Sequence, residues 1–355
     1  MSKIWHNIHP DFKLNGEALT LPSLQKIARD LIAFGEAYEI EMGHFLTDWL
    51  NENDNLSIKT SGSTGEPKTI SIKKVFCINS AKATAAYFQL AAGQTALLCL
   101  SSAFIAGKMM LVRAMVLGLE LDTTAPNSKP LGTTTKTYDF AAMVPMQVMN
   151  SLPRLHQIKK LIIGGAPVSK LLRQQLHQSS TQIFETYGMT ETVTHIAVKP
   201  LNSDKVAFET LADISVEKDE RNCLVIKAPK IAAQKVVTND LVDLIDEHHF
   251  IWLGRFDNII NSGGIKLIPE QIEAKLAEVI SDRFFVAGMP HESLGEQLVL
   301  LVEGRPDIEF IQQTIEKLDS IRTYEKPKKI ISVIEFISTP TGKVSRLETL
   351  KALEI

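Results

Sequence analysis

Apolar and polar residues follow two different periods along this chain, and the period changes at definite places. Residues 23–38 and 41–50 carry apolar side chains at helical spacing, and the polar stretch 51–55 ends that pattern. Strict alternation at 69–72 then predicts a strand that follows a polar loop. We therefore expect the chain to open with two helices, which serve as scaffold, before a loop and a strand.

Short apolar runs next alternate with longer segments of helical spacing, a pattern typical of an α/β domain with a largely parallel sheet. The runs expected to form these strands are 96–100, 141–144, 161–163 and 182–184. Beyond about residue 222 the apolar runs are short and separated by turn residues, which favours an antiparallel or mixed β region. Those later runs are 224–226, 235–237 and 250–253.

The last hundred residues have the pattern of a smaller, separate α+β unit. Its expected helices and strands fall at 270–279, 284–287, 298–302, 308–318 and 330–336. The sequence thus predicts the α/β class, with a large domain over 1–253 that holds mixed and parallel sheets. A boundary at 254–257 precedes a small domain over 258–355, which is long enough to fold as a lobe.

Composition supports a folded protein with a substantial core, because 45% of the 355 residues are hydrophobic and only 22% are charged. A net charge of -3 and a pI near 6.3 give no broad positive field, which argues against nucleic acid as the main partner. Cys77, Cys99 and Cys223 lie too far apart for a paired metal site or a disulfide scaffold. We expect them to be reduced core thiols.

Targeting signals are absent from the pattern. Residues 1–16 contain no apolar core of a secretory signal. The most apolar stretch, 90–121, is interrupted by Lys108 and Arg113, which would be costly at the centre of a bilayer. The sequence therefore predicts a cytoplasmic protein without membrane insertion, and it leaves a homo-oligomer open.

Residues 60–68 read Thr-Ser-Gly-Ser-Thr-Gly-Glu-Pro-Lys and concentrate hydroxyls, glycines and one lysine in a single loop. Glycines let backbone N–H groups approach phosphate oxygens, while hydroxyls and an ammonium supply donors and charge. Composition alone would also suit a flexible linker. The loop is not a Walker A motif, because Pro67 stands where that motif has glycine. The predicted phosphate-binding residues are Thr60, Ser61, Gly62, Ser63, Thr64, Gly65 and Lys68.

This loop closely resembles the signature loop of the adenylate-forming superfamily, which includes acyl-CoA synthetases, luciferases and amino-acid adenylation domains. The resemblance implies a large domain followed by a small, mobile one. Residues 164–169 (Gly-Gly-Ala-Pro-Val-Ser) resemble the family's segment that borders adenine, and residues 187–192 (Tyr-Gly-Met-Thr-Glu-Thr) resemble its next motif. Alone, the first would be a capped strand-to-helix turn and the second a plain turn. The residues implied are Gly164, Gly165 and Ala166 beside adenine, Tyr187 and Gly188 at the base, Thr190 at phosphate and Glu191 on magnesium.

Residues 238–240 read Thr-Asn-Asp where the family has Thr-Gly-Asp, and the resemblance implies that Asp240 binds the ribose hydroxyls. Asparagine tolerates unusual backbone angles better than most residues, so we expect the family's turn to survive with Asn239. Residues 254–257 (Gly-Arg-Phe-Asp) resemble the hinge motif. This implies that Arg255 lies near ribose or phosphate and that Asp257 is the pivot between the domains.

Two motifs of the small domain complete the family order. Residues 262–266 (Ser-Gly-Gly-Ile-Lys) resemble the loop beside the pantetheine arm of CoA, which implies that Gly263 and Gly264 border CoA. Residues 340–344 (Pro-Thr-Gly-Lys-Val) resemble the catalytic-lysine loop, which makes Lys343 the expected catalytic residue, together with Thr190 and Glu191. Without the other motifs, these would be a glycine turn and a solvated lysine.

The resemblance implies an ATP-dependent acid-thiol ligase that uses ATP, Mg²⁺ and coenzyme A. It would form an acyl-AMP from a carboxylate and then transfer the acyl group to CoA after rotation of the small domain. Because two anions meet in the first step, positioned cations and donors are needed at the α-phosphate. Another acid, a carrier-protein acceptor, or a catalytically silent nucleotide-binding sensor remain alternatives.

Within the superfamily the chain is most similar to the o-succinylbenzoate-CoA ligase family of menaquinone biosynthesis, and its segment ahead of the phosphate loop looks reduced. The spacing from Gly107 to Arg113 reproduces that of an arginine which meets the aromatic carboxylate in those enzymes. A dicarboxylate needs such a partner, because its second anion would otherwise be desolvated alone. Arg113 could equally lie on a helix surface. Lys108 and His195 are weaker candidates for the same acid.

Overall fold

The computed structural model describes residues 3–59, 69–132, 134–338 and 344–353. The helices in these ranges are α1 (Leu21–Phe34), α2 (Ala37–Leu50), α3 (Lys74–Phe88), α4 (Ile105–Leu117), α5 (Pro145–Ser151), α6 (Lys170–Leu176), α7 (Pro269–Leu276), α8 (Ile308–Glu316) and α9 (Arg346–Ala352). The first eleven strands are β1 (Lys13–Leu14), β2 (Glu17–Ala18), β3 (Asn55–Lys59), β4 (Thr69–Lys73), β5 (Thr95–Leu98), β6 (Glu120–Thr123), β7 (Tyr138–Met143), β8 (Ile158–Ile163), β9 (Gln182–Gly188), β10 (His195–Pro200) and β11 (Phe208–Thr210). The remaining strands are β12 (Ser215–Lys218), β13 (Cys223–Lys227), β14 (Val236–Leu244), β15 (His249–Arg255), β16 (Ile260–Ser262), β17 (Ile265–Leu267), β18 (Phe284–His291), β19 (Gly295–Glu303) and β20 (Lys329–Val333).

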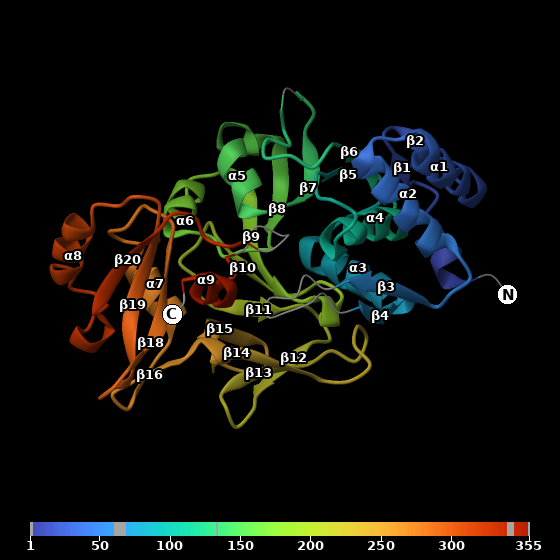
Figure 1. The fold of residues 1–355 in the computed structure, drawn as a ribbon. Coiled ribbons are helices and arrows are strands. Elements are labelled where there is room, and N and C mark those ends of the chain that lie inside the picture. Colours follow the sequence, from blue (N-terminus) through green and yellow to red (C-terminus); the bar gives the residue numbers. More distant parts are fainter. Residues whose placement is uncertain (1–2, 60–68, 133, 339–343, 354–355) are drawn as a thin grey trace.

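One long mixed sheet forms the larger part of the molecule (Figure 1). Strands β1, β6, β5, β7, β8 and β9 are parallel neighbours, and β9 through β15 continue the sheet by antiparallel pairing. The expected strands in 96–184 therefore form the parallel centre, and those in 224–253 form the antiparallel wing. This confirms the predicted α/β class with mixed and parallel strands.

A second sheet is built from strands that follow β15 in the chain, with β20 parallel to β19 and the other pairs antiparallel. Helices α7 and α8 contribute apolar side chains to its core, among them Ile272 and Ile311. In Figure 1 this part lies to one side of the large sheet, and the ion pair of Lys170 with Glu278 (2.8 Å) joins the two. Residues 254–257 connect them, although the domain boundary itself stays a prediction.

The two amino-terminal helices differ from the pattern that we expected. Helical spacing over 23–38 predicted one helix, but α1 ends at Phe34 and α2 begins at Ala37. A Cβ at Gly35 would approach the Cβ of Glu39 to 2.8 Å, so the chain turns there where only glycine fits. Glu39 then accepts a hydrogen bond from the backbone N–H of Glu36 (2.8 Å) and starts the next helix. Periodicity missed this break because both helices present apolar residues to the same core.

The thiols of Cys77, Cys99 and Cys223 are free and buried, as expected. Burial raises the pKa of Cys77 and of Cys99 to about 12, so both stay protonated at neutral pH. Within the described ranges, the structure contains no helix that is both long and apolar enough to cross a membrane.

Gly107 sets how closely helix α4 approaches the end of β5. A Cβ at this position would overlap the backbone carbonyl of Ser101 and lie 2.9 Å from that of Leu100. We expect Gly107→Ala to lower the free energy of unfolding by about 1 to 3 kcal/mol, although alanine is the better helix former. Denaturant unfolding measures this, and Lys82→Ala on the exposed face of α3 is the control, because it also places alanine in a helix but removes only an exposed side chain. An unchanged free energy of unfolding in Gly107→Ala would show that α4 can move away from β5.

Candidate active site

The two segments expected to border adenine lie side by side at the carboxyl edge of the parallel strands. Residues 164–166 follow β8 directly, and Tyr187 and Gly188 end the neighbouring strand β9. A Cβ at Gly164 would come within 2.6 Å of the Thr186 hydroxyl oxygen, so the two segments are in contact. Ligands of open parallel sheets bind at this edge. The fold therefore brings these two segments together, and their contact with adenine stays a prediction.

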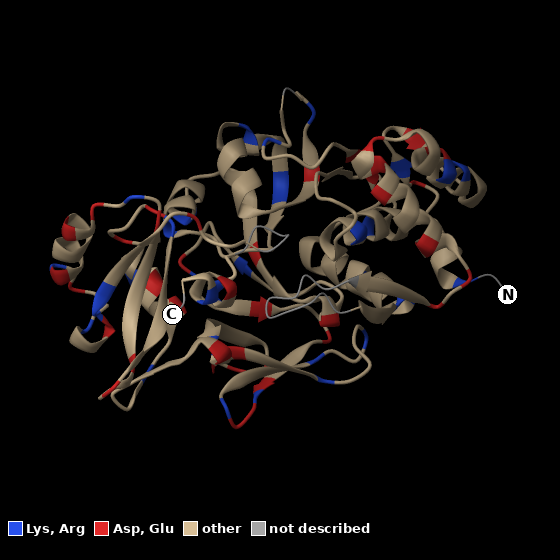
Figure 2. Cartoon of the chain, viewed as in Figure 1, with Lys and Arg blue, Asp and Glu red and all other residues tan. Residues whose placement is uncertain are grey.

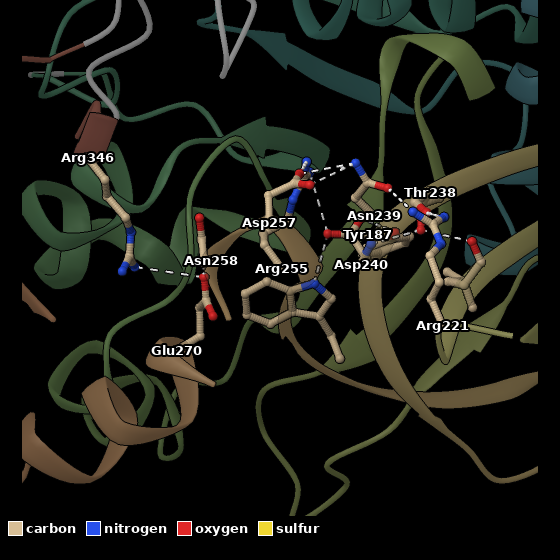
Figure 3. Close-up of polar contacts among 12 residues, drawn as sticks. Tyr187, Arg221, Thr238, Asn239, Asp240, Arg255, Asp257, Asn258, Glu270 and Arg346 are labelled. Atoms are coloured by element: carbon tan, nitrogen blue, oxygen red, sulfur yellow. Dashed lines mark hydrogen bonds and ion pairs between the residues drawn. The ribbon is translucent and has the colours of Figure 1, made fainter. Parts of the chain in front are cut away.

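Asp240 is the point where three of the predicted nucleotide residues meet (Figure 3). The hydroxyl of Tyr187 donates to Oδ2 of Asp240 (2.6 Å), and Arg255 lies directly opposite on β15 with its Nη1 3.6 Å from Oδ1. The indole N–H of Trp252 also donates to Oδ1 (3.2 Å). Burial, and then the charge of Asp240, hold the pKa of Tyr187 well above its ordinary value. The phenol therefore remains a donor, and Asp240 is fixed from two strands.

The ring of Tyr187 packs among other aromatic side chains. The edge of the ring packs against Phe250 (5.2 Å between centroids) and against Phe208 (5.9 Å). An aromatic ring can stack on another flat π system such as a purine. Tyr187 thus joins the carboxyl edge of β9 to the carboxylate of Asp240, and its contact with adenine stays a prediction.

Our expectation for residue 239 was wrong in one respect. Asn239 lies within the extended strand β14 and has no positive φ, so the substitution of glycine needs no unusual backbone angle. Its side chain instead contacts the predicted hinge segment: Nδ2 donates to both oxygens of Asp257 (3.2 and 3.1 Å). Asp257 also accepts from Nη2 of Arg255 (3.2 Å). No pattern in the sequence indicates this link, because it joins residues 18 positions apart.

Thr190 and Glu191 lie in the short 3₁₀ turn Thr190–Thr192, and the residue after this turn, Val193, has an unusual backbone conformation. Val193 has φ 66° and ψ −60°, and the N–H of Thr194 donates to the carbonyl of Thr192 (2.7 Å). This is a γ-turn of the rare, strained kind, which costs on the order of 1–3 kcal/mol for a branched residue. Strain of this kind is common where a fold must place a functional side chain.

The carboxylate of Glu191 is exposed at the start of this turn. Among the described residues, no group of three or more His, Cys, Asp and Glu side chains could enclose a metal ion. Magnesium often binds through one or two carboxylates, with water and substrate phosphates as the other ligands. A single hard carboxylate beside a nucleotide site therefore fits Mg²⁺ carried in with ATP.

Arg113 and His195 form a buried polar cluster with Thr84, a residue that sequence reasoning missed. Arg113 is 1% exposed, and its Nη2 lies 3.5 Å from Nδ1 of His195 while its Nε donates to Thr84 (3.4 Å). Burial lowers the pKa of Arg113 to about 10, and burial, then the charge of Arg113, hold the pKa of His195 well below its ordinary value. His195 is therefore neutral and accepts from Arg113, so it cannot be a second cation.

Among the residues that the structure describes, no carboxylate is a hydrogen-bond or ion-pair partner of Arg113. Its remaining partner is the sulfur of Met110, 3.7 Å from Nη1, which is a weak acceptor. A buried cation with only neutral partners is costly, so this site is complementary to an incoming anion. His195 also pairs with Gly188, so the cluster lies directly behind the Tyr187–Gly188 segment.

Lys108 lies apart from this cluster. Its ammonium donates to the backbone carbonyls of Ser102 and Ala103 and stands over the ring of Phe45 (5.5 Å). Burial lowers its pKa. The structure therefore does not bring Lys108 together with Arg113, and its contacts are those of a residue that anchors the loop before α4.

Several predicted residues lie outside the described part of the chain: the phosphate-loop residues Thr60, Ser61, Gly62, Ser63, Thr64, Gly65 and Lys68, and Lys343. The strands and the helix that flank them are described. Val344 pairs with Ser338, and Arg346 at the start of α9 makes an ion pair with Glu273 (2.7 Å). Their roles stay predictions from the sequence.

Gly263 and Gly264 connect strands β16 and β17 of the small sheet, with φ of 57° and 82°. The N–H of Gly263 donates to the carbonyl of Leu294 (2.9 Å), which also belongs to the small part. Both glycines are thus required by a tight turn, and this turn explains them without a contact to CoA. Their place beside CoA stays a prediction.

Blue and red segments are scattered among tan ones over both parts of the chain, so charged residues of both signs occur in each (Figure 2). The strongest grouping at the candidate site is the set around Asp240, Arg255 and Asp257 (Figure 3). Among the contributors to this set, Trp252 and Arg221 had no signal in the sequence, since an aromatic residue in a strand is ordinarily core and an arginine in a turn is ordinarily solvated.

Comparison with known proteins places this geometry in a family. The AMP-binding enzyme family matches residues 35–213, just over half of the chain. A solved structure of an acyl-CoA synthetase (AMP-forming)/AMP-acid ligase II-like protein from Dyadobacter fermentans is 35% identical, with a TM-score of 0.61, and the match covers 93% of this chain and 98% of that one. The probable 2-succinylbenzoate–CoA ligase of Mycobacterium tuberculosis is 26% identical over 93% of this chain and 94% of its own length.

A further structure shows the same fold at low identity. The o-succinylbenzoate CoA synthetase of Bacillus subtilis, solved with its acyl-adenylate intermediate, is 14% identical with a TM-score of 0.80, and the match covers 95% of each chain. The extent of the family match, the 35% identity to a solved relative and the convergence of the nucleotide motifs at Asp240 agree. This protein belongs to the family of AMP-binding enzymes.

Proposed function

We propose that this protein is an ATP-dependent acid-CoA ligase that converts a carboxylate to an acyl-AMP and then to a CoA thioester, with o-succinylbenzoate as the acid. The observation that carries the ligase assignment is that Tyr187 and Arg255 both approach the carboxylate of Asp240, next to the carboxyl edge of β8 and β9. Relatives named 2-succinylbenzoate–CoA ligase support the choice of acid.

The nucleotide would lie along the edge between residues 164–166 and Tyr187. Asp240 keeps free lone pairs on both carboxylate oxygens, because Tyr187 and Trp252 each use one, and it can accept the ribose hydroxyls. Arg255, 35% exposed, can turn between Asp240 and a phosphate oxygen. Gly164, Gly165, Ala166 and Gly188 would bring backbone close to the base.

The acid would enter beside Arg113, where its second carboxylate replaces the weak contact with Met110. Because Arg113 is buried, Met110 would have to move aside to admit the acid. A methionine side chain is flexible enough to do so. The neutral His195 holds the guanidinium from the other side. An anion bound there removes the cost of the unpaired charge and gains charge-assisted hydrogen bonds. A monocarboxylate would leave that cost in place.

The reacting carboxylate then meets the α-phosphate, where Lys343 would stand between the two anions and the hydroxyls of 60–68 would hold the pyrophosphate leaving group. Magnesium bound to the nucleotide through Glu191 would neutralise phosphate charge. Thr190 would donate to phosphate. After adenylation, the small part would rotate about Asp257, withdraw Lys343 and bring Gly263 and Gly264 to the pantetheine arm.

Acid-dependent exchange between pyrophosphate and ATP tests this proposal, with o-succinylbenzoate compared against benzoate and a fatty acid. We expect exchange with o-succinylbenzoate to exceed that with benzoate by about 10²-fold or more, because only the dicarboxylate pairs with Arg113. Thioester formation with free CoA, compared with a carrier-protein thiol, identifies the acceptor. No exchange with any acid would support a silent nucleotide-binding protein, and preference for a monocarboxylate would remove the assignment of Arg113.

A further inference from the structure

Asn239 makes contacts that the glycine of the family's Thr-Gly-Asp motif could not make. Its Nδ2 donates to both carboxylate oxygens of Asp257, and its Oδ1 accepts from Nη1 of Arg221 (2.9 Å), as Figure 3 shows. A carboxylate only accepts and a guanidinium only donates, so these two neighbours fix the orientation of the amide. The side chain is therefore a specific bridge between a strand of the large sheet and the hinge segment.

Arg221, which belongs to the large part, also contacts the hinge segment 254–257. This arginine is held in the β12–β13 turn by Asp219, which accepts from its Nε and Nη2 (2.9 and 2.7 Å). Its guanidinium lies 5.3 Å from the ring centre of Phe256, and its Nη2 donates to the carbonyl of Thr238 (3.1 Å). Arg221 thus supports both Asn239 and the residue that precedes Asp257.

The next residue of the chain is tied to the other part of the molecule. Nδ2 of Asn258 donates to Oε1 of Glu270 on α7 (2.5 Å), and Nη2 of Arg346 lies 3.9 Å from the same oxygen. Asp257 is therefore held from strand β14 of the large sheet, while Asn258 is held from helix α7. A rotation about this point must change the contacts of at least one of the two residues.

We infer that Asn239 is a positioning residue that clasps Asp257 and stabilises the present arrangement of the two parts relative to the rotated one. The inference rests on the proposed hinge role of Asp257. The contact joins a neutral amide to a charged carboxylate, and both groups are partly exposed. Its loss should therefore change the balance of the two arrangements by roughly threefold to tenfold, below the range for buried charged pairs.

Asn239→Gly restores the family residue and removes the clasp. We expect it to change the ratio of the two half-reactions, pyrophosphate–ATP exchange and thioester formation from supplied acyl-AMP, by about threefold to tenfold. Asn239→Asp has nearly the same shape but places a carboxylate against Asp257, so it should change the ratio in the same direction and further. Asn222→Gly is the matched control. Asn222 already has φ 63°, and among the described contacts its backbone makes hydrogen bonds while its side chain makes none.

A distance measurement separates this inference from the proposed function. Cysteines introduced at the exposed positions Lys205 and Lys317 can carry a fluorescent pair, because the native thiols are buried. We expect the distance distribution of the ligand-free protein to shift in Asn239→Gly and in Asn239→Asp but not in Asn222→Gly. Unchanged distances in both Asn239 variants would overturn the clasp, whether or not the protein has ligase activity. Absence of exchange in the unmodified protein would instead count against the proposed function alone.

Discussion

Replacing Lys343 with alanine should reduce acyl-AMP formation by at least about 10²-fold and leave thioester formation from supplied acyl-AMP nearly unchanged. The first half-reaction brings a carboxylate to the α-phosphate, and removal of one positioned charge from such a transition state costs on the order of 3 kcal/mol. The second half-reaction begins from an acyl-AMP whose reacting acyl carbon is uncharged. No carboxylate has to approach a phosphate in this step, so no cation is needed between them. Pyrophosphate–ATP exchange measures the first step, and release of AMP from supplied acyl-AMP and CoA measures the second.

Lys351→Ala is the matched control for this variant. Lys351 lies on α9, eight positions further along, and its exposed ammonium pairs only with Glu348 among its described contacts. We expect neither half-reaction to change in the control. Equal losses of both half-reactions in Lys343→Ala would contradict a lysine that serves only adenylation, and unchanged exchange would remove it from the catalytic site.

Arg113→Met should have opposite effects on activity and on stability. We expect kcat/KM for o-succinylbenzoate to fall by about 10²- to 10³-fold, which is the usual cost of losing one partner of a buried charge pair. The same change removes a buried cation whose partners within the described ranges are all neutral. Its pKa of about 10, lowered by burial, corresponds to a penalty of about 3 kcal/mol for the charged form.

Part of this gain is offset, because Nδ1 of His195 and the hydroxyl of Thr84 each lose a donor. We therefore expect a net rise of about 1 to 2 kcal/mol in the free energy of unfolding of the ligand-free protein. Denaturant unfolding without substrate measures it. Arg29→Met on the exposed face of α1 is the control and should change neither quantity.

Two outcomes would contradict this account of Arg113. A variant that still prefers o-succinylbenzoate to benzoate would show that the second carboxylate binds elsewhere. A large loss of stability would show that the guanidinium is an integral part of the core. Between about pH 6.5 and 8.5 the preference of the unmodified protein should not change, because His195 stays neutral and Arg113 stays charged over that range.

The nucleotide motifs could be found from the sequence because each is a short continuous segment whose chemistry lies in its own residues. The loop at 60–68, the segment at 164–169 and the hexapeptide at 187–192 each carry their donors, glycines or carboxylate within nine residues. Alternation of apolar runs likewise predicted the parallel centre and the antiparallel wing of the sheet, because strands and helices bury their faces with different periods. The break between α1 and α2 was missed because apolar spacing does not record where a side chain would clash.

Local patterns in the sequence were therefore sufficient to predict the α/β class, the order of most helices and strands, and the family to which the motifs belong. Four further features became visible in the folded protein: the bridge from Asn239 to Asp257, the hydrogen bond from Trp252 to Asp240, the burial of Arg113 against a neutral His195, and the contact of Lys108 with a different loop. These features depend on burial and on contacts between residues far apart in the chain. Charge, protonation and free lone pairs follow from such contacts, and no local pattern of residues encodes them.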